Sequence, residues 1–229
     1  MAYNITEKET QPVVYNHFNG THDEILARLC VSELCKGWPL YRDASEWTNY
    51  RSMFTKKGAK IWTSWSGGKA IDDFISVSKE GRKNGDFIIH RENGTLVDLN
   101  LPLGRAIGKM KATITQRFMI EDTPIDVECD CRFIFWCLIE DGEWKVKYNR
   151  LFYEKDKVIA ADGNNLPGIF TKEKLRKYPE GYRYLAVAQH EIGHPILEDL
   201  PTTMGRPFGK MYGAMAAWLR GENVDLNWD

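Results

Sequence analysis

The chain lacks any hydrophobic run long enough to span a membrane, and its polar start, MAYNITEKETQ, has no apolar core of a secretory signal. It also lacks an excess of charge, because 31 Lys and Arg stand against 32 Asp and Glu in interspersed positions. Such a balance leaves no basic footprint for nucleic acid and no polybasic patch for a membrane surface. We therefore expect a cytoplasmic protein that binds neither nucleic acid nor membranes.

Cysteine is scarce as well, with five residues in 229: Cys30, Cys35, Cys129, Cys131 and Cys137. An odd number inside apolar segments is typical of reduced, buried thiols in the cytosol. Cys129 and Cys131 share one strand face, but no second pair follows at metal-ligand spacing, so we expect core packing instead of a zinc site. Neither a metal nor an organic cofactor is expected.

A long β-hairpin is predicted over residues 125–158. Two runs rich in β-branched and aromatic residues flank Asp141-Gly142, the strongest short-range hairpin signal. Because strand side chains alternate, one face of the first arm is apolar from Cys129 to Cys137 and can line a core or a pocket. The other face carries Glu128, Asp130 and Arg132, with Phe118 and Trp136 nearby, and is expected to be solvated or to meet a second subunit.

The other elements follow from apolar spacing and capping signals. Thr21 and Glu24 form a capping box that opens a helix, and Gly37-Trp38-Pro39 is expected to end it. Asp43 is expected to cap a second helix, with Glu46 three residues later. Further on we expect a strand at 59–65, a helix at 69–83, strands at 87–99 and 104–119, and helices within 171–195 and 204–223.

This order, helices first and then long antiparallel strands, indicates the α+β class, with a strongly bent antiparallel sheet and helices on its concave face. We divide the chain into an N-terminal arm (1–20), a domain with an internal pocket (21–160) and a C-terminal helical extension (161–229). The extension either closes the open end of the sheet or docks on a second subunit.

Three features, in this order and spacing, resemble the SnoaL-like family of the nuclear-transport-factor-two-like superfamily. They are Trp47 with Phe54-Thr55, the strand bearing His90 before Gly94-Thr95, and the hairpin D-G-x-W-K from Asp141 to Lys145. The resemblance covers residues 21–160 and implies a cone-shaped α+β barrel. Enzymes of this superfamily include scytalone dehydratase and small polyketide cyclases, so the resemblance implies a lyase or an isomerase.

The resemblance also implies a catalytic pair, with Asp43 and His90 facing each other inside the cavity. An Asp bonded to one imidazole nitrogen fixes the tautomer, so the other nitrogen can take up and return a proton. The alternatives are an Asp43 that only caps a helix and a His90 that is an ordinary core residue. We expect Tyr41, Thr63, Trp65, Cys131, Phe133 and Asn149 to line the pocket and bind substrate.

Two departures from the pattern argue against the scytalone reaction itself. The tyrosine that precedes the family's Asp is Arg42 here, with Tyr41 one residue earlier, and Thr115-Gln116-Arg117 stands where scytalone dehydratase has a second His. Single-base chemistry is therefore expected.

A second motif, His190-Glu191-Ile192-Gly193-His194, matches the H-E-x-x-H zinc hydrolase pattern. Gly193 and Pro195 are expected to end the helix at the motif, and no later His can supply a third ligand.

We thus expect a cofactor-independent lyase or isomerase for a small oxygenated metabolite such as a polyketide, aromatic or terpenoid intermediate. The rivals are a non-catalytic binding or assembly module of the same fold and a zinc hydrolase. A homodimer or homotrimer is compatible with each.

Overall fold

The computed structural model describes residues 20–163 and 165–228. The predicted arm, apart from Gly20, lies outside the described residues. Within these two ranges, no helix is both long and apolar enough to cross a membrane.

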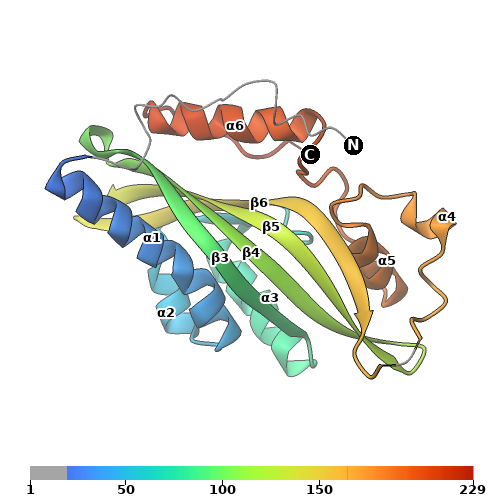
Figure 1. Cartoon of the computed structure of the whole chain (residues 1–229). Helices are drawn as coiled ribbons and strands as arrows, with labels where there is room; N and C mark the ends of the chain where they lie inside the picture. Colours follow the sequence, from blue (N-terminus) through green and yellow to red (C-terminus); the bar gives the residue numbers. More distant parts are fainter. Residues whose placement is uncertain (1–19, 164, 229) are drawn as a thin grey trace.

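A six-stranded sheet with the order β2-β1-β6-β5-β4-β3 forms the centre of the fold (Figure 1). Its strands are β1 (Lys60–Trp62), β2 (Lys69–Ala70), β3 (Phe87–Asn100), β4 (Arg105–Ile120), β5 (Thr123–Glu140) and β6 (Glu143–Ala160). The last four form an antiparallel meander, whereas β1 pairs with β6 in parallel. The predicted hairpin is confirmed as β5 and β6, and its turn residues Asp141 and Gly142 both have positive φ, as a type I′ turn requires.

The meander bends because three register shifts interrupt its ladders. β5 and β6 shift at Asp130/Cys131 and at Trp136/Cys137, and β3 shifts at Glu92/Gly94. Each extra residue bends its strand and increases the twist. The result is the predicted strongly bent sheet, and it remains open with β2 and β3 at its edges.

Helices α1 (His22–Asp43), α2 (Trp47–Ser52) and α3 (Ile71–Lys83) lie on the concave face, and their apolar side chains join those of the sheet in one core. The capping box of Thr21 and Glu24 is present at the start of α1. Close approach of α1 to the sheet needs a glycine on β4, because a Cβ at Gly108 would lie 2.3 Å from Cys35 Sγ. Cys30, in contrast, is exposed, so the prediction that all five thiols are buried is wrong.

The predicted end of the first helix is also wrong. α1 continues through Pro39 to Asp43, so Asp43 closes α1 instead of capping α2. Pro39 removes one backbone donor, but Trp38 and Pro39 are buried in the core, and this packing outweighs the missing hydrogen bond. Ser45, with φ of 60°, then turns the chain into α2.

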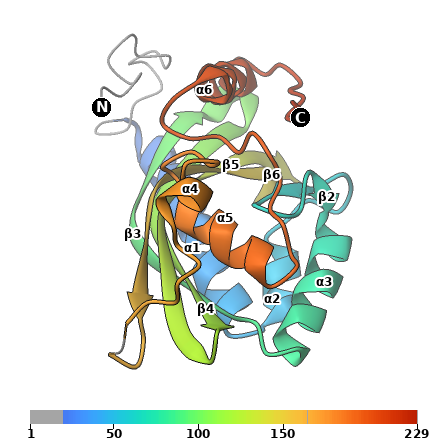
Figure 2. The same ribbon diagram turned by 90° about the vertical axis from the view of Figure 1, so that its right-hand side faces the viewer.

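The C-terminal helices cover both faces of the sheet. The short 3-10 helix η3 (Leu101–Leu103) connects β3 to β4 within the meander. The meander is followed by three helices: α4 (Lys172–Leu175), α5 (Arg183–Glu191) and α6 (Arg206–Leu219). α5 crosses the end of the sheet and joins the concave core, as Figure 2 shows. α6 lies on the convex face, where its apolar side chains pack on Ile107, Ile134, Trp136 and Phe152. Trp136 is fully buried there and is not free for a second subunit.

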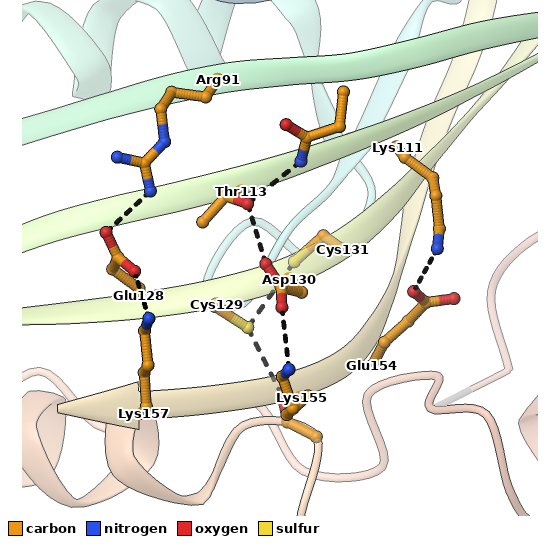
Figure 3. A network of polar contacts seen from close by, with 12 residues as sticks. Arg91, Lys111, Thr113, Glu128, Cys129, Asp130, Cys131, Glu154, Lys155 and Lys157 are labelled. Carbon is orange, nitrogen blue, oxygen red and sulfur yellow. Dashed lines mark hydrogen bonds and ion pairs between the residues drawn. The ribbon is translucent and has the colours of Figure 1, made fainter.

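Ion pairs cover the part of the convex face that α6 leaves uncovered (Figure 3). Glu128 binds Arg91 at 2.7 Å and Lys157 at 3.0 Å, and Asp130 accepts a hydrogen bond from Thr113 and pairs with Lys155. The predicted polar face of the hairpin is thus paired across neighbouring strands.

Asp156 on β6 holds the start of α5. Its Oδ2 accepts a hydrogen bond of 2.9 Å from the backbone N–H of Leu185, in the first turn of α5, where Tyr182 provides no side-chain cap. Burial of this carboxyl raises its pKa to about 7, against the opposing effects of the backbone donors and Arg183.

A raised folded-state pKa stabilises the fold at low pH, and this contribution is lost as the pH rises from about 4 to about 7. Asp156→Asn removes the titration and keeps an oxygen that accepts the hydrogen bond. We expect the free energy of unfolding of D156N, relative to wild type, to increase by at most about 1.4 kcal/mol per pH unit in this window. Urea denaturation at pH 4.5, 5.5 and 7.5 measures it, and a constant difference between the two proteins would contradict the assignment.

Candidate active site at the end of helix α1

Asp43 and His90 meet inside the concave face. Asp43 is the last residue of α1, and His90 lies near the start of β3. The ring Nδ1 of His90 lies 2.8 Å from Asp43 Oδ1, and the backbone N–H of His90 donates to Asp43 Oδ2 at 2.6 Å. One carboxylate therefore fixes both the backbone and the ring of the same residue.

The hydrogen bond to Asp43 determines the tautomer of His90. A carboxylate can only accept, so the proton of a neutral imidazole lies on Nδ1 and leaves a lone pair on Nε2. Among the described residues, no hydrogen-bond partner of Nε2 is present. The ring packs edge-on to Trp38 and Phe133, and its side chain is only 4% exposed.

Burial in this aromatic setting lowers the pKa of His90 below its ordinary value of 6.5, although the hydrogen bond to Asp43 acts in the opposite direction. The imidazole is therefore neutral at neutral pH and able to accept a proton at Nε2. A depressed pKa of this kind suits a general base.

Two guanidinium groups approach the same carboxylate. Arg42 Nη1 lies 3.9 Å and Arg82 Nη2 lies 3.8 Å from Asp43 Oδ1. Arg82 is anchored to the backbone, since its Nη2 donates to the carbonyl oxygens of Ile88 at 2.7 Å and of Asp43 at 3.4 Å. Arg42 has no such hydrogen bond to any residue that the structure describes.

A cavity of about 30 Å³ lies beside His90. Its walls come from α1, the loop after β1, and strands β3 to β6. The residues lining it are Trp38, Arg42, Thr63, Ser64, Trp65, Ile88, His90, Ile114, Gln116, Phe133, Leu151 and Tyr153.

Three of the predicted pocket residues, Thr63, Trp65 and Phe133, line this cavity. The other three, Tyr41, Cys131 and Asn149, lie outside its walls. The alternation of side chains along a strand correctly placed Cys131 and Asn149 on the inward face. The cavity occupies only a short part of that face, however, and both residues are buried among neighbouring side chains outside it. Cys131 contacts the sulfur of Cys129 at 3.6 Å, and Asn149 Nδ2 donates to the carbonyl of Ile134.

Tyr41 points elsewhere because α1 does not end before it. Its ring packs close to Gly37 on α1 itself, next to Met53. Sequence reasoning instead missed Arg42, Gln116 and Tyr153 as lining residues. One feature of the sequence pointed to Arg42 as a lining residue. It directly precedes Asp43, at a position where the family pattern has a tyrosine.

The H-E-x-x-H motif does not form a zincin helix. α5 ends at Glu191, and Gly193 has φ of 78°, so His194 lies beyond the helix and does not share a face with His190. Both histidines are exposed, and Glu191 pairs with Lys174 at 3.2 Å. Within the described part of the chain, no three His, Cys, Asp or Glu side chains gather as metal ligands do.

A bent sheet with helices on its concave face and a buried His-Asp pair define a cone-shaped α+β pocket protein. The profile of the SnoaL-like domain matches residues 23–150, which is more than half of the chain. The chain belongs to the SnoaL-like family, within the nuclear-transport-factor-two-like superfamily.

Similar proteins extend beyond this domain. Pea pathogenicity protein 2 of Fusarium vanettenii is 40% identical over 216 residues, which cover 91% of this chain and 92% of the relative. An uncharacterized protein of Emericella nidulans is 39% identical over 224 residues, with the same two coverages. Among solved structures, a hexachlorocyclohexane dehydrochlorinase (LinA) type 2 has the same fold, with a TM-score of 0.52 and 13% identity over 64% of this chain and 98% of that one.

The electrostatics of the pair can be tested by an NMR titration of the histidine ring nitrogens. We expect His90 to titrate below 6.5 with its neutral form protonated at Nδ1, because burial disfavours the cation. Asp43→Asn should lower the pKa of His90 further, since it removes the negative charge that stabilises the imidazolium. The resonances of the exposed His190 and His194 should not respond to the substitution. A His90 midpoint above 6.5, or one raised by Asp43→Asn, would refute this description.

Proposed function

We propose that the protein is a cofactor-independent acid/base enzyme, a lyase or isomerase, that acts on a small oxygenated and largely apolar metabolite. The observation that carries the proposal is the Nδ1 contact of 2.8 Å between His90 and Asp43, next to a cavity with aromatic walls. It leaves an uncharged Nε2 that has no hydrogen-bond partner among the described residues, and this is the arrangement that proton transfer needs.

In this proposal His90 Nε2 takes a proton from a carbon next to a carbonyl group. The electron pair of the C–H bond moves toward the carbonyl oxygen, and the imidazolium returns its proton either to a leaving hydroxyl group, which departs as water, or to another carbon. Asp43 orients the ring and stabilises the imidazolium that forms in between. Gln116 and Thr63 in the cavity walls are the neutral polar groups available to orient the substrate.

Substrate entry requires the cavity to open, because about 30 Å³ holds little more than a water molecule and small-molecule sites usually measure ~300–1,000 Å³. The segment from α5 onward is the natural cover. Gln189 of α5 donates to Gln116 Oε1 at 2.9 Å, and the backbone N–H of Leu197 donates to the carbonyl oxygen of Ser64 at 2.8 Å. Displacement of this segment would uncover two lining residues at once.

The small cavity also favours a second candidate, a binding or assembly module that keeps the fold without turnover. In that case the His-Asp pair would serve only to join α1 to β3. The names of the relatives do not separate the two candidates, because pea pathogenicity protein 2 is named for a role in disease and not for a reaction.

The decisive experiment follows carbon-bound hydrogen exchange in D₂O by NMR, with a panel of small ketones, β-hydroxy ketones and hydroxylated aromatic carbonyl compounds. We expect wild type to exchange or dehydrate at least one compound. His90→Gln should lower that rate by about 10²–10⁴-fold, because general acid/base catalysis contributes that much. Asp43→Asn should lower it less, since the base remains but is no longer oriented.

His190→Gln is the matched control, because it makes the same substitution at an exposed histidine outside the cavity and should leave the rate unchanged. Circular dichroism and the unfolding midpoint of each variant report whether the fold is intact. Equal rates for wild type and a folded H90Q would exclude His90 as the base. Binding of panel compounds without any exchange would instead favour the binding module.

A further inference from the structure

Arg42 is a buried cation without a partner suited to it. The residue is 7% exposed and lines the same cavity as His90. In the described part of the chain, its Nε has no hydrogen-bond partner, and its nearest carboxylate oxygen lies 3.9 Å away. A guanidinium normally satisfies its five donors with two or three acceptors when it is buried.

The one carboxylate nearby is already occupied. Both oxygens of Asp43 accept hydrogen bonds from His90, at 2.6 and 2.8 Å, and Arg82 approaches the same Oδ1 as Arg42 does. With His90 neutral, Arg42, Arg82 and Asp43 together carry a net charge of about +1, and Asp86 acts on Arg42 only from beyond ion-pair distance.

Among the described residues, no other group forms an ion pair with Arg42, although Tyr50 and Asp86 favour its charged form from a distance. Its guanidinium carbon lies 5.7 Å from the centre of the Phe74 ring, and the buried Tyr50 hydroxyl also has no hydrogen-bond partner among the described residues. Burial lowers the pKa of Arg42 from its usual value, yet a guanidinium remains charged in proteins. Keeping an uncompensated charge inside a protein costs free energy, so a structural role alone would favour an apolar residue.

We propose that Arg42 binds the carboxylate of the substrate, so that the metabolite processed in this cavity is a small carboxylic acid. The proposal rests on the function proposed for the same cavity and adds the substrate class. A carboxylate in the cavity would supply the two acceptors that a guanidinium binds in parallel. It would also place the carbon that loses a proton near Nε2, because Arg42 and His90 line the same small cavity.

The test compares two acids with their neutral amides: acetate with acetamide, and benzoate with benzamide. Binding is measured by NMR titration of the protein. We expect wild type to bind each acid at least 10-fold more tightly than its amide. Arg42→Met should abolish this preference while leaving amide binding unchanged. Arg42→Lys should retain part of the preference, since Lys keeps the positive charge but lacks the planar guanidinium that binds a carboxylate through two parallel hydrogen bonds.

Stability without ligand provides a second readout. Removal of an uncompensated buried charge should leave Arg42→Met as stable as wild type or more stable, whereas loss of a structural arginine would lower its unfolding midpoint. Arg91→Met, on the convex face, is the matched control and should keep the preference for acids. Equal affinities for acid and amide in wild type, no binding of either acid, or a preference that survives in R42M would each overturn the proposal.

His90→Gln separates this proposal from the proposed function. If H90Q and wild type both prefer the acids but neither catalyses exchange, the carboxylate site stands and the enzyme proposal fails. If wild type catalyses exchange of neutral carbonyl compounds and shows no preference for acids, the enzyme proposal stands and the carboxylate site fails.

Discussion

The contact between Asp43 and His90 is the constraint on which the concave side of the molecule depends. A single carboxylate accepts from both the ring and the backbone of His90, and thereby joins the end of α1 to the first part of β3. The contact forms only because α1 continues past Pro39 and because Gly108 lets it lie close to β4. A shorter helix would remove Asp43, and Arg42 with it, from the cavity.

The C-terminal extension completes the fold by covering both faces of the bent sheet. α5 closes the concave side, held at its start by Asp156 and near its end by Gln189, and α6 buries the aromatic part of the convex side. The sheet of this chain therefore has little free apolar surface where α6 lies. The start of α5 is thus bonded to a buried carboxyl whose pKa is about 7.

The sequence predicted those parts of the fold that depend on local signals. Asp141-Gly142 determined the hairpin and its register next to the turn, and the capping box at Thr21 determined the start of α1. The end of α1 could not be predicted, because burial of Trp38 and Pro39 outweighs the local preference of proline. Strand parity identified inward positions such as Cys131 and Asn149, but parity does not say which inward side chains leave space between them. The burial of Arg42 with only a long contact to Asp43 likewise depends on the packing of distant segments.

The central claim is that Asp43 holds His90 as a neutral base with a free Nε2 beside the cavity. Neutron diffraction from deuterated crystals at neutral pD locates the ring deuterons directly. The account predicts one deuteron on Nδ1, directed at Asp43 Oδ1, and none on Nε2. A deuteron on Nε2, alone or together with one on Nδ1, would contradict it, because His90 could then not accept a proton from a substrate.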